Sequence, residues 1–126
     1  MRYLCLIHVD EKQLEAMPAR EMAALEAEHL DYDAALRRCG QFVVAEALEP
    51  SSATTLVRVR QRRTSVTDGP FAETKEQVAG FFLIEAHDLN EAIQIAANIP
   101  AARLGTVEVR PVRRLVAEQH SAAVAW

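Results

Sequence analysis

Two segments of the chain are apolar at almost every position, and both predict strands with two buried faces. They cover residues 3–9 and residues 79–86. Short continuous apolar runs are typical of strands inside a sheet that is covered on both sides. Shorter segments rich in strand-forming residues predict additional strands at residues 41–47, 54–60, 64–67 and 106–110. The alternation within 54–60 and the polar turn after it predict a hairpin with one solvated face.

Apolar residues spaced by three and four positions predict two helices. The first follows Pro18, ends at Gly40 and carries the stripe Met22, Leu25, His29, Tyr32, Leu36 and Cys39. The second starts at a capping box formed by Asp88 and Glu91, stops at Pro100 and carries the stripe Leu89, Ala92, Ile93, Ala96 and Ala97. Proline in the first turn, glycine after the last turn and a capping box are typical helix boundaries. We expect both stripes to face the sheet.

The order of these elements predicts an α+β fold, a ferredoxin-like βαββαβ sandwich with an inserted β-hairpin. Two helices can cover only one face of such a sheet, whereas the two apolar strands require cover on both. A second copy packed sheet to sheet would supply the missing cover. The sequence therefore predicts a homodimer.

The overall composition predicts a single domain at residues 1–115 followed by a C-terminal tail at 116–126. A net charge of −4 and a pI near 5.6 argue against a nucleic-acid partner, which requires clustered positive charge. No apolar run approaches the roughly 20 residues of a membrane span, so we expect no membrane partner. The first residues lack a secretory signal pattern, and we expect a cytoplasmic protein in which Cys5 and Cys39 are reduced rather than bridged.

Neither metal-binding nor nucleotide-binding motifs are present in the sequence. The histidines are His8, His29, His87 and His120. No two of them have the spacing of paired metal ligands, and none belongs to a Cys–His set. The four glycines form no phosphate-binding pattern. We therefore expect neither a metal nor a cofactor.

His29 is the first candidate for chemistry, because it is a titratable ring on a helix stripe that points at the sheet. An imidazole titrates near neutral pH and can act as a general acid or base. Such a ring needs a partner that fixes its tautomer, and Asp68, at the end of the 64–67 strand, is the candidate. We expect the helix to pack beside that strand. The competing interpretation is a partly buried histidine with a purely structural hydrogen bond.

The loop after Asp68 supplies further candidates. Asp68, Gly69 and Pro70 form a strong turn signal, and Glu73 and Lys75 follow it. Lys75 is a candidate for holding an anionic substrate and Glu73 for sharing proton transfer; the alternative is a solvated loop.

Three other positions have similarly open interpretations. Arg103 binds an anion or pairs with a carboxylate, and His8 is a candidate for the lining of a dimer cavity. The arginines of the hairpin attract an acidic ligand or protect a solvated edge from strand addition; they are Arg58, Arg60, Arg62 and Arg63.

The string from Asp68 to Gln77 resembles the signature of the DGPF family, part of the YCII-related proteins. The resemblance extends over about residues 1–113 and includes residues 80–86, 99–103 and 107–112. It implies a dimeric α/β barrel. It also implies a His–Asp active site, in which His29, followed by Leu30, resembles the family's helix histidine and Asp68 resembles its aspartate.

Two functions remain open. The first is a cofactor-independent enzyme that performs acid/base chemistry of the isomerase or lyase type on a small organic molecule. Its catalytic residues would be His29 and Asp68, and its substrate-binding residues Glu73, Lys75, Phe71, His8 and Arg103. The second is a non-catalytic ligand- or partner-binding module in the sigma-factor-linked regulatory setting that the resemblance implies.

Overall fold

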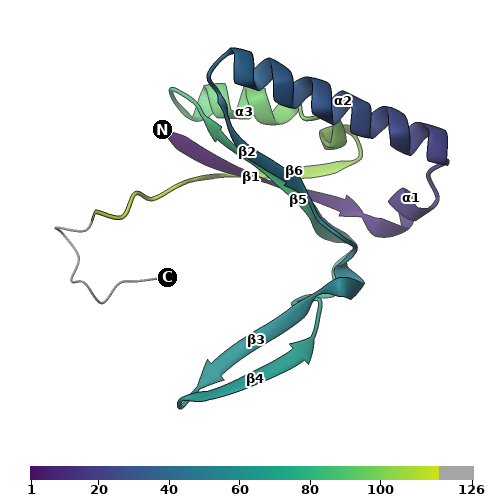
Figure 1. Cartoon of the computed structure of the whole chain (residues 1–126), viewed down its shortest axis with the longest axis vertical. Coiled ribbons are helices and arrows are strands. Elements are labelled where there is room, and N and C mark those ends of the chain that lie inside the picture. The colour runs from purple at the N-terminus through teal and green to yellow at the C-terminus, as the bar shows by residue number, and fades with distance from the viewer. Residues whose placement is uncertain (117–126) are drawn as a thin grey trace.

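The computed structural model describes residues 1–116 of the chain. The predicted tail at 116–126 therefore lies, beyond its first residue, outside the described residues, as does His120. The chain folds into one four-stranded sheet with helices on one side, and a separate two-stranded hairpin on the other (Figure 1). No helix in this described part is long and apolar enough to cross a membrane.

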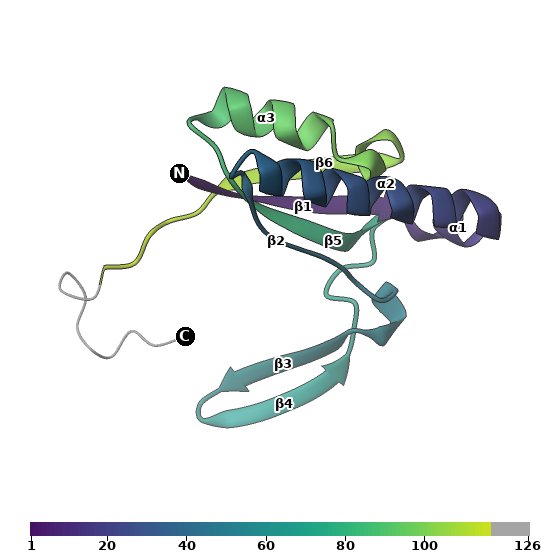
Figure 2. The ribbon, with the colours of Figure 1, turned by 45° about the horizontal axis from the view of Figure 1, so that its top comes forward.

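The main sheet is antiparallel throughout and has the strand order β2-β5-β1-β6. Its strands are β1 (Arg2–Asp10), β2 (Phe42–Ala47), β5 (Glu76–Glu85) and β6 (Gly105–Pro111). The helices that cover it are α2 (Ala19–Arg38) and α3 (Leu89–Ala97) (Figure 2). This order and these crossovers confirm the predicted ferredoxin-like sandwich.

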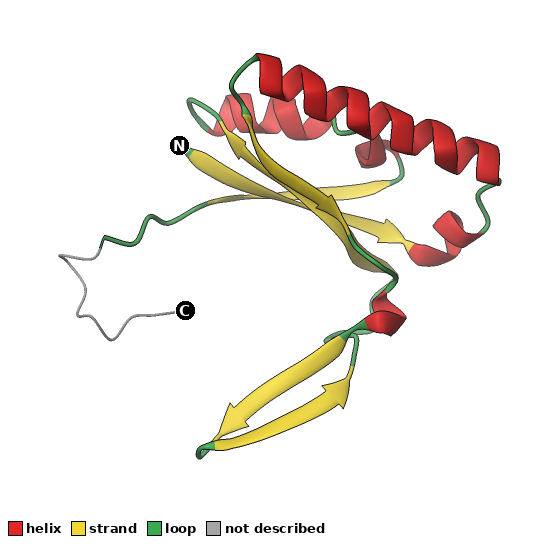
Figure 3. Ribbon diagram, viewed as in Figure 1, coloured by secondary structure: helices red, strands yellow, loops and turns green. Residues whose placement is uncertain are grey.

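The inserted hairpin consists of β3 (Thr55–Arg60) and β4 (Arg63–Asp68), which pair only with each other. Figure 3 shows that these two strands stand apart from the main sheet. A 3-10 turn, η1 (Ser51–Ala53), leads into β3, and a short helix, α1 (Glu11–Glu15), follows β1. The hairpin was predicted, but its position away from the sheet was not.

One face of the main sheet carries the core. On β1 the buried residues alternate, and Tyr3, Cys5, Ile7 and Val9 face the helices. Phe82 and Ile84 of β5, Leu36 of α2 and the residues Ala92, Ile95 and Ala96 of α3 complete the layer. Apolar burial of this kind is the main contribution to folding free energy.

The opposite face, here called the open sheet face, is only half-buried within one chain. It carries Leu4 and Leu6 of β1 opposite Leu83 and Phe81 of β5. Val44 on β2 lies beside Leu83 and is exposed. The prediction that both faces of the apolar strands are buried is thus met within the chain on one face only.

Helix α2 follows the predicted boundaries. Pro18 precedes it, and Gly40 after its last turn adopts φ 71°, the left-handed conformation of a C-terminal cap. Leu25 and Leu36 of its stripe are buried, but Cys39 is exposed because it already lies at the helix end.

The predicted stripe of α3 is wrong in part. Asp88 caps the helix by accepting a hydrogen bond from the Glu91 backbone N–H at 2.9 Å, as expected. Leu89 and Ile93, however, remain about half exposed, and Ile95 takes their place in the core beside Ala92. The helix packs through its small alanines, so the buried stripe is rotated away from the larger side chains.

Replacing Gly105 with alanine is expected to destabilise the fold by about 3 kcal/mol, because inserted atoms without space force the backbone to shift. A Cβ atom at Gly105 would lie 1.9 Å from the backbone oxygen of His8 on the neighbouring strand. Urea unfolding measures the loss. Gly40→Ala is the control, because a Cβ atom at Gly40 would meet nothing within 4 Å. Its free energy of unfolding should fall by only about 1 kcal/mol, since alanine disfavours the left-handed backbone conformation found there. Equal losses in the two variants would contradict this account.

Candidate functional site

Two adjoining clefts lie where β1 runs into α1 and where the loop after β4 returns to β5. The first has a volume of about 550 Å³ and the second about 630 Å³. The two clefts share four lining residues, Ser51, Pro70, Thr74 and Gln77. They are therefore neighbours, and the loop between β4 and β5 forms part of the wall of each. Volumes in this range are typical of small-molecule sites. The loop is the segment that carries the family-like string, and it rims both clefts.

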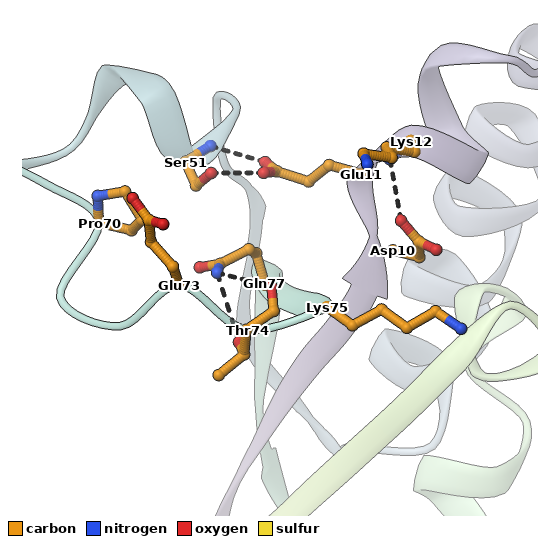
Figure 4. Close-up of a pocket in the computed structure, with 9 residues that line it drawn as sticks. All are labelled: Asp10, Glu11, Lys12, Ser51, Pro70, Glu73, Thr74, Lys75 and Gln77. Atoms are coloured by element: carbon orange, nitrogen blue, oxygen red, sulfur yellow. Dashed lines mark hydrogen bonds between the residues drawn. The ribbon is translucent and has the colours of Figure 1, made fainter.

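The first cleft is lined almost entirely by residues with polar or charged side chains, three of them from the end of β1 and the start of α1 (Figure 4). Asp10 caps α1 by accepting a hydrogen bond from the Lys12 backbone N–H at 3.0 Å. Glu11 accepts hydrogen bonds from the Ser51 backbone N–H, at 2.6 Å, and from its hydroxyl. The sequence did not predict α1. Its role is to join the end of β1 to the start of the hairpin.

The loop between β4 and β5 is fixed by Gln77. The Gln77 amide donates hydrogen bonds to the backbone oxygens of Ala72, at 2.9 Å, and Thr74, at 3.0 Å. With the loop held in this way, Glu73 and Lys75 remain exposed and line the first cleft. In Figure 4 Glu73 lies beside Pro70, whereas Lys75 extends away on the other side of Gln77.

The second cleft is more apolar and contains a histidine. Leu48, Val78 and Phe71 contribute to its wall, and Phe71 is 78% exposed at this position. His8 of β1 lines the same cleft. Four of the predicted substrate-binding residues therefore gather around this pair of clefts: His8, Phe71, Glu73 and Lys75.

His8 has a carboxylate partner that the sequence analysis missed. Its Nε2 lies 2.9 Å from Oε1 of Glu108 on β6. The side chain of His8 is 26% exposed and that of Glu108 50%. A carboxylate on one ring nitrogen orients the imidazole and leaves the other nitrogen for proton transfer. The pair depends on the register of β1 and β6, in which Leu6 lies opposite Glu108. The only available sequence signal was the alternation of residues 106–110.

His29 lies on the helix side of the sheet. Its ring is half-buried and 6.0 Å from that of Phe82, centroid to centroid. Burial lowers the pKa of His29, and the nearby Asp33 and Glu28 partly offset this effect. Asp33, one turn further along α2, has its own pKa raised by burial.

The structure does not bring His29 and Asp68 together within one chain. Asp68 ends β4 opposite Thr55, in the hairpin that leaves from the other side of the sheet (Figure 2). Within residues 1–116 no hydrogen bond or ion pair joins the two side chains. The expectation that the helix packs beside this strand is wrong, because the strand belongs to a separate sheet. A role for either residue stays a prediction.

Arg103 also lies away from the clefts. It donates two hydrogen bonds to the carboxylate of Glu28 on α2, at 2.8 and 3.3 Å. The hydrogen bonds from the Arg103 guanidinium lower the pKa of the Glu28 carboxyl group. The contact ties the turn η2 (Pro100–Arg103) to α2, which is the carboxylate-pairing alternative considered for this residue.

The described residues contain no group of three or more His, Cys, Asp or Glu side chains arranged to hold a metal ion. In the first cleft the carboxylates of Asp10 and Glu11 are occupied by a helix cap and by Ser51. The side chains that line the two clefts are an imidazole with a carboxylate partner, further carboxylates, the lysines Lys12 and Lys75, and an apolar wall.

Comparison with known proteins gives three findings. The sequence profile of the YCII-related domain matches residues 1–116. A Rhizobium meliloti (strain 1021) protein, "Uncharacterized protein R00369", is 32% identical over 121 residues, which cover 89% of this chain and 92% of that protein.

The third finding is a solved structure. It is 5-chloro-2-hydroxyhydroquinone dehydrochlorinase (TftG) from Burkholderia phenoliruptrix AC1100, in complex with 2,5-dihydroxybenzoquinone. It shares 16% sequence identity and a TM-score of 0.49, with 96% of this chain and 100% of that chain covered. A likeness at this level says nothing about the chemistry of the present chain.

The burial of His29 predicts a pH-dependent stability. Its pKa is lower in the folded chain than the ordinary value near 6.5, so below that pH the unfolded chain binds more protons. The uncharged His29 ring therefore contributes to the free energy of unfolding above about pH 6.5. This contribution is lost as the pH falls from there toward the pKa of His29 in the folded chain. We expect His29→Gln to lose less stability than the wild type between about pH 7.5 and about pH 5.5, measured by urea unfolding. An identical loss in both proteins would show that His29 titrates normally.

Proposed function

The chain belongs to the YCII-related domain family, and from this premise we propose that it acts on a small organic molecule by proton transfer. The substrate would bind in the two clefts beside the loop between β4 and β5. The reaction is cofactor-independent acid/base chemistry of the isomerase or lyase type. Membership in the family supports a common fold and site region, while the residues of this chain suggest the chemistry.

The observation that carries the proposal is the His8–Glu108 pair in a cleft of suitable size. His8 would take a proton from the substrate at one ring nitrogen, while Glu108 accepts a hydrogen bond from the other and stabilises the charged ring. A positioned general acid or base typically contributes about 10²–10⁴-fold in rate. Because the removed proton can be returned to another substrate atom, or a leaving group can depart, one such residue suffices for isomerisation or elimination.

The remaining cleft residues suit binding rather than proton transfer. Phe71, Leu48 and Val78 offer apolar contact to a ring or short aliphatic chain in the second cleft. Lys75 and Glu73 supply polar contacts in the first. We assign proton transfer to His8 rather than His29, because His29 lines neither cleft.

A non-catalytic binding role is the second candidate function. The observation that favours it is the hairpin of β3 and β4, whose side chains are almost all exposed and available to a partner. In that role the clefts hold a ligand that is not converted, and His8 with Glu108 only shapes the wall.

We also propose that the open sheet face pairs with that of a second copy. Leu4, Leu6, Phe81 and Leu83 form a continuous apolar strip at its centre, and no helix of the described chain covers it. A contiguous apolar patch of this kind marks an association surface. A twofold axis would let the same strip cover itself in both copies, as in a dimeric α/β barrel.

A thermal-shift screen of small organic metabolites tests the site. We expect at least one ligand to raise the melting temperature of the wild type but to raise that of Phe71→Ala much less. His87→Ala is the control, because His87 lines neither cleft, and its melting temperature should rise as in the wild type. For a ligand that is converted, His8→Ala should lower kcat/KM by about 10²–10⁴-fold. Glu108→Gln should lower kcat more than it raises KM, because it disturbs the orientation of the ring. Unchanged turnover in His8→Ala would refute the acid/base assignment, and binding without any turnover would favour the second candidate function.

Light scattering tests the pairing. We expect twice the 14.0 kDa chain mass at micromolar concentration. Leu6→Lys should shift the protein to the monomer, because it places a charge in the centre of the apolar strip. Leu30→Lys, on the exposed surface of α2, should leave the mass unchanged. A monomeric wild type would overturn the pairing.

A further inference from the structure

The hairpin of β3 and β4, here called the arm, is the largest feature that the proposed acid/base reaction does not use. It projects from one end of the main sheet on the side opposite the helices, and Figures 1 and 2 agree on this placement. Its two strands pair with each other from Thr55 opposite Asp68 to Arg60 opposite Arg63. None of its residues is buried in the chain. An isolated two-stranded hairpin is at best marginally stable in water, so the arm requires another surface.

One face of the arm is apolar. Val57 lies directly opposite Val66, and Val59 lies opposite Thr64, so these side chains share a face. The three valines are 63%, 63% and 57% exposed, respectively. A single exposed valine is ordinary on a protein surface. Three neighbouring valines on one face of a two-stranded hairpin form a contiguous apolar patch, which is typical of a contact surface.

The arm also differs in charge from the rest of the chain. Its four arginines, opposed by Asp68 alone, give residues 55–68 a net charge of +3. Because the whole chain carries −4, the remaining residues carry −7. Two arms repel each other, whereas an arm and the body of a second copy attract each other. A protein identical to this one therefore offers the complementary surface.

We propose that the arm docks on the body of a second copy of this chain. The valine face is buried in that contact, and the arginines lie against acidic side chains of the other copy. A twofold axis generates two such contacts, one for each arm. The contact continues the open sheet face, because the arm leaves the sheet on that side. This inference concerns a surface separate from the His8 cleft and does not depend on the chemistry proposed there.

Docking of the arm also bears on the clefts through its two ends. Pro50, Ser51 and Thr54 precede β3, Pro70 and Phe71 follow β4, and all five line the second cleft. A contact that fixes the arm thereby fixes this wall.

Hydrogen exchange of the full chain at several protein concentrations, with sedimentation velocity on the same samples, tests the proposal. We expect the amides of residues 55–68 to become protected in step with the fraction of dimer. Dimer formation with an arm that exchanges equally fast at every concentration would overturn the proposal while leaving the pairing of the open sheet faces intact. Protection in a monomer would place the arm on its own chain, and protection only on addition of polyanionic RNA would assign it to nucleic acid. Both results overturn the proposal.

Charge substitutions in the valine face provide a second test. Val57→Asp and Val66→Asp should each weaken the dimer at least about 100-fold, because a carboxylate replaces a buried methyl surface. Ile93→Asp is the matched control, since Ile93 is a 49% exposed apolar residue on α3 in the helix layer. Its dimer affinity should stay within about twofold of the wild type. Equal affinities in all of these variants would contradict docking. Loss of metabolite binding or turnover in His8→Ala bears on the cleft alone, so the two proposals fail separately.

Discussion

The structure depends on the position of β1 in the middle of the sheet. In the described part of the chain β1 is one of the two inner strands of the main sheet, paired on one side with β5 and on the other with β6. Its alternating side chains divide the molecule into two faces. Tyr3, Cys5, Ile7 and Val9 enter the core, while Leu4, Leu6 and His8 face the other way. Desolvation by this packing also raises the pKa of the Cys5 thiol to about 11, which leaves it protonated and unreactive at neutral pH.

The candidate site is a consequence of where β1 ends. His8 lies two residues before that end, and the strand continues through Asp10 into α1. Glu11 then reaches η1, at the base of the hairpin, and Gln77 shapes the returning loop. The rigid sheet thus supplies an oriented histidine, and the loop supplies exposed side chains of varied chemistry. This division between scaffold and loop is common in binding sites.

The hairpin connects the site to the question of assembly. Its ends form part of a cleft wall, but its strands contribute nothing to the core of their own chain. The open sheet face and the valine face of the arm are two separate surfaces that gain from contact with another molecule. They differ in character: the first is an apolar strip on the main sheet, and the second is an apolar face of a hairpin that also carries four arginines. An assembly that buried both surfaces would also hold the ends of the hairpin, and with them one wall of the second cleft, in place.

Local patterns in the sequence determined the elements and their order. Periodicity, a capping box, a glycine cap and the Asp-Gly-Pro turn act over a few residues. The two long helices, the hairpin and the ferredoxin-like order could therefore be predicted, together with the loop that carries Phe71, Glu73 and Lys75. Only the tertiary structure decided which side chains meet. The partner of His8 lies 100 residues away and is set by the register between β1 and β6. The separation of His29 from Asp68 follows from a hairpin that pairs with itself instead of the sheet. Register and strand partner depend on the sum of contacts along whole strands, and no short segment of the sequence contains that sum.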